Sequence, residues 1–302
     1  MLAIAYLGPE GTFAEQAARA LVPDGELRPA ESVLAAIAAL RAGAVDGACV
    51  PVENSMEGSV PATLDAMAED EPVVAVAETV LPIRFSVLVR PGTTAADVRN
   101  VATHPHAAAQ VRDWIAAHLP HAAMVLTPST SAAAVAVLDK DADAAVCAPI
   151  AVRYYPLAEL ATGVHDLGDA ETRFLLLRHP GTVPEPTGTD RTSLVAETAH
   201  RPGALLEVLA EFALRGINLT RIESRPIKGK LGEYRFFLDC EGHVAEEAVG
   251  DALAQLHRRC TSARFLGSYR RCGNGTPRPG PDPAGFVTAR HWLTAVRAGR
   301  SA

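Results

Sequence analysis

Hydrophobic and polar positions follow two periods along the first 178 residues. Short apolar runs such as 2–7 and 45–50 have the length of buried strands, and they alternate with segments in which apolar residues recur every three or four positions. In one such segment, 33–40, Ser32 lies in the cap position and Gly43 follows the end. This rhythm is typical of βα units on a mainly parallel sheet, so the pattern predicts an α/β layer protein.

The same alternation predicts further elements up to residue 177. A helix is expected to begin at Thr12, whose spacing to Glu15 forms a capping box. The other predicted helices are 105–119, ended by Pro120, and 130–138; the other predicted strands are 73–80, 85–89, 124–126, 144–147 and 174–177.

A second, smaller domain is predicted after a linker. Residues 179–191 are rich in Pro, Gly and Thr, which is typical of a connection between domains. The following pattern predicts a ferredoxin-like βαββαβ unit, with strands at 192–199, 218–227, 234–238 and 263–269 and helices at 203–214 and 244–256. In the tail, apolar residues with helical spacing predict a helix that docks on the body or on a partner subunit: Phe286, Ala289, Trp292, Leu293 and Val296.

Composition narrows the class of protein. The chain has 302 residues, 48% of them hydrophobic, which is enough for one large domain and a smaller one. Lys and Arg total 28 against 35 Asp and Glu, so the formal charge is −7 and nucleic acid is not an expected partner. Apolar runs are too short to cross a bilayer and the first residues lack a basic region, so we expect a cytoplasmic protein with no membrane partner.

Metal ions and disulfides are not expected. The five cysteines are scattered without a CxxC pair, which fits a reducing compartment and small core residues. His104 and His106 flank Pro105 at a helix start, where capping or solvent exposure is favoured over metal ligation. The acidic stretch 69–71 is interpreted as a solvated turn.

Three segments could carry chemistry. The turn 8–13 aims backbone N–H groups from a helix N-terminus and either binds an anion or is a tight turn with a capping Thr. The segment 51–59 offers Asn54 and Ser55 as neutral donors at a strand end, although a turn and helix cap would explain much of it.

The third segment is 171–174. Thr172 and Arg173 lead into an apolar strand, which suggests a cleft that faces a ligand; a surface ion pair of Arg173 with Glu171 or Asp169 is the alternative.

Taken in order, these segments and the ferredoxin-like unit resemble prephenate dehydratase of the monofunctional, actinobacterial type with an ACT regulatory domain. The resemblance covers about residues 3 to 270 and rests on YLGPEGTF, ACVPVENSMEGSV, AAAQVRDWIAAHLP and EFALRGINLTRIESRP. Many members of that family carry Gln where this chain has His106, so His106 is left out of the expected site.

The resemblance implies a fold and a division of the chain. It implies a bilobal, periplasmic-binding-protein-like catalytic domain over 1–180, with one lobe of about 1–78 plus 163–179 and the other of about 79–162. The ACT domain would span 192–270, followed by a Pro/Gly-rich linker and C-terminal helix over 271–302.

It also implies an activity, the loss of water and carbon dioxide from prephenate to give phenylpyruvate, with no cofactor and no metal. By the resemblance Thr172 is the catalytic hydroxyl and Arg173 an anion anchor. The implied substrate contacts are Thr12, Asn54, Ser55, Gln110, Ser129, Thr130 and Phe174.

Phenylalanine is the implied allosteric effector, held between chains of a homodimer or homotetramer. The implied effector contacts are Gly203, Ala204, Leu205, Leu206, Asn218, Leu219, Glu223, Ser224, Arg225 and Pro226. An arogenate dehydratase and a non-catalytic solute receptor with the same fold are the alternatives.

Overall fold

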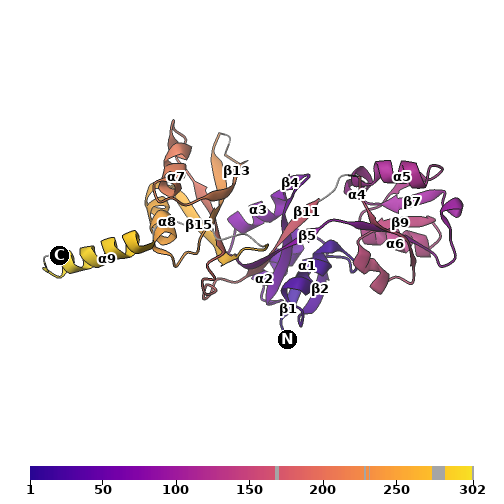
Figure 1. The fold of residues 1–302 in the computed structure, drawn as a ribbon, viewed down its shortest axis with the longest axis horizontal. Helices are drawn as coiled ribbons and strands as arrows, with labels where there is room; N and C mark the ends of the chain where they lie inside the picture. The colour runs from indigo at the N-terminus through magenta and orange to yellow at the C-terminus, as the bar shows by residue number, and fades with distance from the viewer. Residues whose placement is uncertain (167–169, 228, 231, 274–282, 301–302) are drawn as a thin grey trace. The chain divides into compact units, whose positions relative to one another are not determined.

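The computed structural model describes residues 1–166, 170–227, 229–230, 232–273 and 283–300 (Figure 1). The chain forms two units: the first contains 1–66 and 79–179, and the second contains 67–78 and 180–302. The backbone therefore passes between the units three times, at 66–67, 78–79 and 179–180.

The first sheet of unit 1 is built from βα units, as predicted. Strand β1 (Ala3–Leu7) pairs in parallel with β2 (Glu26–Ala30) and with β3 (Gly47–Asn54), and β11 (Glu171–Arg178) pairs with β3 in the antiparallel direction. The short β4 (Gly58–Ser59) also pairs with β3. The helices of this part are α1 (Phe13–Leu21), α2 (Val33–Arg41) and α3 (Pro61–Ala68).

Helix α2 illustrates how the apolar stripe works. Val33, Ile37 and Leu40 are buried and Ser32 accepts the Ala35 N–H at the cap, which confirms the predicted helix. Leu34, which was included in the same apolar set, is 55% exposed, because it lies one position off the buried stripe.

The second sheet of unit 1 has the strand order β10-β6-β9-β7-β8. Its faces are covered by different helices, with α4 and α5 on one side and α6 on the other (Figure 1). Along one strand, Val87 packs in the same cluster as Ile115 of α5, whereas the next residue, Leu88, packs with Val137 of α6. The strands are β6 (Phe85–Val89), β7 (Asn100–Thr103), β8 (Ala123–Leu126), β9 (Ala144–Cys147) and β10 (Ala158–Val164); α6 is Thr130–Leu138.

Several predictions in unit 1 need correction. The single helix expected over 105–119 is two, α4 (Pro105–Gln110) and α5 (Arg112–His118), because Val111 adopts φ −127° and ψ 11° between them. Strand β10 continues to Val164, which pairs with Phe85. Strands β2, β7 and β10 were not predicted.

Unit 2 has the ferredoxin-like order that the sequence predicts. The strands are β12 (Asp190–Glu197), β13 (Leu219–Pro226), β14 (Tyr234–Glu241) and β15 (Ser262–Arg270), and the helices are α7 (Ala204–Ala213) and α8 (Glu247–Arg259). The antiparallel order is β13-β14-β12-β15. Leu194, Phe212, Leu238, Val249 and Leu256 are buried together between sheet and helices, and β13 lies at a sheet edge.

The segment 67–78 joins this unit. Within it the acidic stretch 69–71 is a bend in which Asp70 and Glu71 are exposed, as predicted. The end of the segment forms β5 (Val74–Pro82), in which Ala75 pairs with Gly267. The Glu78 carboxylate is buried and accepts from Arg191 at 2.5 Å and from the Cys272 N–H at 2.7 Å. The Arg264 guanidinium donates to the backbone oxygens of Glu69 and Asp70, both at 3.1 Å.

The tail helix is α9 (Pro283–Arg297). Phe286 packs against the unit 2 core and Arg290 forms an ion pair with Glu247, so one end of the helix docks as predicted. Trp292, Leu293 and Val296 remain exposed. The predicted linker over 274–282 lies outside the described residues, and within the described ranges no helix is long and apolar enough to span a membrane.

Gly267 allows the close approach of two backbones. It adopts φ +139°, and a Cβ built there would lie 2.2 Å from the Ala75 carbonyl oxygen. We predict that Gly267→Ala destabilises the protein by more than about 2 kcal/mol, because backbone atoms cannot move away as a side chain could. The thermal unfolding midpoint measures this.

The matched control is Gly43→Ala. Gly43 also has a positive φ, +68°, but an added Cβ would meet nothing within 4 Å, so only the backbone strain of about 1 kcal/mol is expected. Equal midpoints for the two variants would contradict the steric explanation.

Candidate active site

Unit 1 contains a cavity of about 190 Å³ lined by residues of both of its sheets. Polar and apolar side chains meet there, with Phe13 and Phe85 in edge-to-face contact at 5.6 Å between ring centroids. The lining residues are Phe13, Asn54, Glu57, Ile83, Phe85, His104, His106, Ala107, Gln110, Thr130 and Thr172. The cavity therefore joins four of the residues expected in the site: Asn54, Gln110, Thr130 and Thr172.

Asn54 and Thr172 face each other across two paired strands. They are register partners at the ends of β3 and β11, and the Asn54 Nδ2 donates to the Thr172 Oγ1 at 2.8 Å. The Asn54 Oδ1 accepts from the backbone N–H groups of Met56 at 2.8 Å and Glu57 at 3.1 Å. Because these N–H groups can only donate, they identify the oxygen end of the amide.

This orientation determines which way the Thr172 hydroxyl points its proton. The Asn54 amide nitrogen donates to the Thr172 oxygen, so that oxygen acts as acceptor in this bond. The Thr172 proton is thus directed to another acceptor, and Thr172 lines the cavity. The Thr172 hydroxyl can therefore donate to an acceptor in the cavity.

The glycine-rich turn contributes less polar chemistry than its sequence suggested. The Thr12 hydroxyl donates to the Leu7 oxygen at 3.1 Å and accepts from the Glu15 N–H at 3.3 Å, which is a helix cap. The Glu15 carboxylate accepts from the Gly11 N–H at 2.7 Å, instead of returning to Thr12 as in a full capping box. The protein's own carboxylate therefore occupies the donor expected to bind an anion, and the turn lines the cavity through Phe13.

Ser55 and Ser129 support the backbone around the cavity. The Ser55 hydroxyl accepts from the Glu171 N–H at 2.9 Å, and the Ser55 N–H donates to the Glu171 oxygen at 2.9 Å. The Ser129 hydroxyl caps α6 by accepting from the Ala132 N–H at 2.9 Å. Both hydroxyls hold elements that carry lining residues, Asn54 and Thr130.

Gln110 lies at the end of α4. It lines the cavity, and its Oε1 is buried without a hydrogen-bond partner among the described residues. A buried amide oxygen without a partner is costly, which favours a ligand or water at this point.

Arg173 and Phe174 lie apart from the cavity lining within the described chain. Arg173 is nearly buried and forms an ion pair with Glu53 at 3.5 Å. Phe174 is 3% exposed and belongs to the core. Asp169, the other suggested partner of Arg173, lies outside the described residues.

Glu57, His104 and His106 also line the cavity and were not expected to. The His106 Nδ1 lies 2.7 Å from the Glu57 Oε2, and the His104 Nδ1 accepts the His106 N–H at 3.3 Å, which confirms the predicted capping role of His104. Burial and the neighbouring His106 lower the pKa of His104. The only signal in the sequence was the HPH motif, since Glu57 is 49 residues away.

Most of the cysteines are buried. Among the described residues no group of three or more His, Cys, Asp or Glu could hold a metal ion. Cys49, Cys147 and Cys240 are buried, as predicted, while Cys260 and Cys272 are half-buried. Burial raises the pKa of the Cys147 thiol, behind Thr130, to about 12, so it carries no thiolate at neutral pH.

The expected effector residues of unit 2 lie at the start of α7 and along β13. Gly203 caps α7 with φ +80°, Ala204 is buried, and Leu206 is 69% exposed. The β13 residues Ser224 and Pro226 are exposed, while Glu223 accepts from Arg221 at 2.9 Å. Of the remaining expected residues, Leu205 lies at the same helix start, Leu219 and Arg225 lie on β13, and Asn218 lies directly before that strand.

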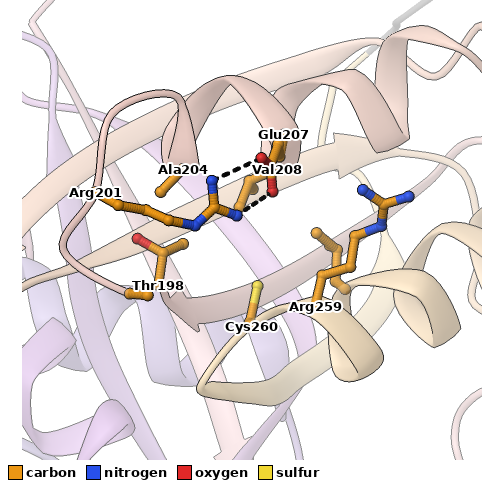
Figure 2. Close-up of a pocket in the computed structure, with 9 residues that line it drawn as sticks. Thr198, Arg201, Ala204, Glu207, Val208, Arg259 and Cys260 are labelled. Atoms are coloured by element: carbon orange, nitrogen blue, oxygen red, sulfur yellow. Dashed lines mark hydrogen bonds and ion pairs between the residues drawn. The ribbon is translucent and has the colours of Figure 1, made fainter.

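A separate small pocket of about 70 Å³ lies between α7 and α8 (Figure 2). Ala204 is its one lining residue from the expected effector set. Figure 2 shows Arg201 with two hydrogen bonds to Glu207, at 2.8 and 2.6 Å, and Cys260 and Arg259 on the other side. Arg201 is thus engaged by a carboxylate of the same protomer.

Family models match both parts of the chain. The prephenate dehydratase model matches residues 4–182 and the ACT domain model matches residues 192–258. A prephenate dehydratase of Amycolatopsis methanolica is 55% identical over 306 residues, covering 100% of both chains.

Solved structures agree with this. The prephenate dehydratase of Arthrobacter aurescens in complex with L-Phe has a TM-score of 0.90 and 42% identity, covering 98% of this chain and 100% of that one. GqqA, described as a novel type of quorum-quenching acylase, has a TM-score of 0.82 and 31% identity, covering 89% of this chain and 98% of that one. With these matches over its whole length, the chain belongs to the prephenate dehydratase family and carries an ACT domain.

Proposed function

We propose that Thr172 assists the departure of the ring hydroxyl when this enzyme converts prephenate into phenylpyruvate, water and carbon dioxide. The observation that carries the proposal is the directed hydrogen bond from Asn54 Nδ2 to Thr172 Oγ1 at the cavity wall. It keeps the hydroxyl oxygen as acceptor, so that the proton can be donated to the substrate.

The reaction needs little more than a positioned donor. The bond between the ring and its carboxylate breaks, its electron pair enters the ring, and the C4–O bond breaks as the ring becomes aromatic. The departing hydroxide accepts one further proton to form water, so a donor at that oxygen lowers the barrier. A Thr hydroxyl is a weak acid, so Thr172 polarises the leaving oxygen or relays a proton from solvent.

The other expected residues take supporting roles. Gln110 and Thr130 line the same cavity and are proposed as direct substrate contacts. Thr12, Ser55 and Ser129 are proposed to act through the elements that they cap or tie. Phe174 is proposed to shape the pocket from the core beneath it.

Arg173 is proposed as an anion anchor that exchanges its Glu53 partner for a substrate carboxylate. The Glu53 side chain is 41% exposed, so it can leave the pair for solvent at low cost. The carboxylate to be anchored is that of the pyruvyl group. Strong binding of the other carboxylate would stabilise the ground state against its loss as carbon dioxide.

We propose catalytic residues 1–180, an ACT domain over 192–270 and phenylalanine as its effector. The relative from Arthrobacter aurescens was solved with L-Phe, which supports the effector. The exposed Leu206 beside the Gly203 cap offers an apolar contact for an aromatic ring next to backbone N–H groups.

We further propose that the protein is at least a dimer. The edge strand β13 exposes Ile222, Ser224 and Pro226, and Tyr234 on β14 is also exposed. An uncovered edge with apolar side chains favours pairing with a second copy, which would complete the effector site.

Arogenate is the alternative substrate and binding without turnover the alternative function. Assays with prephenate and arogenate at equal concentrations, following phenylpyruvate and phenylalanine, distinguish all three. Turnover of prephenate supports the proposal; turnover of arogenate alone, or binding without product, contradicts it.

Thr172→Val keeps the side-chain shape and removes the hydroxyl. We predict a fall in kcat of at least about 100-fold, the contribution of one positioned donor. Thr172→Ser, which retains a hydroxyl, should stay within about 10-fold of the wild type. Near wild-type turnover by a folded Thr172→Val protein would remove Thr172 from the mechanism.

Arg173→Lys should chiefly raise KM for prephenate, by about 10-fold. A Lys ammonium cannot form the two parallel hydrogen bonds that a planar guanidinium donates to a carboxylate. Arg178→Lys, on the same strand, is the control and should leave KM unchanged. A fall in kcat at unchanged KM would instead assign Arg173 to the transition state.

Leu206→Asp should abolish inhibition by phenylalanine, raising the half-inhibitory concentration by more than about 10-fold, because it removes an apolar contact and repels the effector carboxylate. Leu214→Asp is the control, since Leu214 is also exposed, at 81%, but lies at the other end of α7. Activity without phenylalanine should be equal in both. Retained inhibition in Leu206→Asp would place the effector elsewhere.

A further inference from the structure

Two adjoining cavities of unit 1 share a wall. The cavity of about 190 Å³ described above meets a second one of about 150 Å³, lined by Met56, Glu57, His106, Ala109, Gln110 and Ala170. Glu57, His106 and Gln110 line both cavities. Any ligand that fills the site beside Thr172 therefore lies next to the His106–Glu57 pair.

We infer that His106, oriented by Glu57, binds a carboxylate of the substrate through its Nε2–H when the imidazole is charged, and that it thereby makes substrate binding depend on pH. The inference rests on the proposed function, since prephenate supplies the carboxylates.

The two ring nitrogens of His106 have different hydrogen-bonding roles. The His106 Nδ1 lies 2.7 Å from the Glu57 Oε2, and a carboxylate only accepts, so Nδ1 is the donor in this bond. In the neutral ring Nε2 is then an acceptor, which repels a carboxylate oxygen. In the imidazolium Nε2 is a second donor, so protonation converts the same atom from repelling the substrate to binding it.

The charges around the cavities point to the same residue. Prephenate carries two negative charges, whereas the charged or titratable residues that line the two cavities, within the described chain, are Glu57, His104 and His106. Glu57 adds a negative charge, so within this described lining a positive charge can come only from an imidazole. That charge would add to the charge of Arg173, which is proposed above to anchor the pyruvyl carboxylate.

His104 is the weaker candidate for that charge. Its Nδ1 accepts the His106 backbone N–H at 3.3 Å, which requires an unprotonated Nδ1, and burial lowers its pKa. The His106 side chain is 63% exposed, so water can stabilise its charge before the substrate binds. Protonation of His106, facing Glu57 on one side and His104 on the other, is therefore the change that prepares the site for a dianion.

The test compares the full-length wild type with His106→Gln in steady-state assays with prephenate between about pH 6 and 8.5, corrected for the uncatalysed reaction. In the wild type, kcat/KM should fall as the pH rises through the range in which an imidazole loses its proton. His106→Gln keeps a hydrogen-bonding side chain without the charge. It should lower kcat/KM by about 5-fold at the acid end, where the charge is present, and remove the pH dependence.

A control variant sharpens the result. His118→Gln is the matched control, because His118 is an exposed histidine on α5 whose ring stacks on Trp114, away from both cavities. It should reproduce the wild-type profile.

The outcomes distinguish the role of His106 from the dehydratase activity. A flat wild-type profile, an unchanged profile in His106→Gln, or a loss confined to kcat would each overturn the role of His106 while leaving the dehydratase intact. Absence of prephenate turnover in the wild type would instead overturn the proposed function itself.

Discussion

The site depends on one pairing, that of β3 with β11, which join residues 118 positions apart in the chain. The antiparallel register places Asn54 opposite Thr172 at the end of both strands. The turn after β3 then holds the amide oxygen of Asn54 with two backbone N–H groups, which leaves its nitrogen to face Thr172. A shift of the register by one residue would turn Thr172 to the other face of the sheet, and its hydrogen bond with Asn54 would be lost.

The helices and their caps could be predicted from the sequence because they depend on interactions between residues close together in the chain. Helix α6 begins at Thr130 and ends at Leu138 as predicted, with Ser129 as its cap, since period and capping chemistry both lie within a few residues. Asn54 and Thr172 were each recognisable as polar residues at strand ends. Their mutual hydrogen bond was not, because nothing near either residue encodes a partner in a distant strand.

The failures also have physical reasons. Strand β2 contains Glu26, Arg28 and Pro29 and is mostly exposed, so it lacks the apolar alternation by which buried strands are recognised. The break at Val111 lies within a continuous apolar period and is caused by backbone geometry, not by a Gly or Pro. Thr172 and Arg173 are adjacent in sequence, yet of the two only Thr172 lines the cavity within the described chain, because adjacency does not determine which face of a strand a residue takes.

The segment 67–78 changes what counts as the regulatory part of the protein. Its contacts to Arg191, Arg264, Gly267 and Cys272 make it a structural member of the unit that otherwise begins at residue 180. A protease that cut the chain between 180 and 189 would not release a free ACT module, because this inserted segment would still hold it to the other fragment. Exchange of ACT domains between enzymes of this type would accordingly have to transplant two separate stretches of gene, the short internal one as well as the long terminal one.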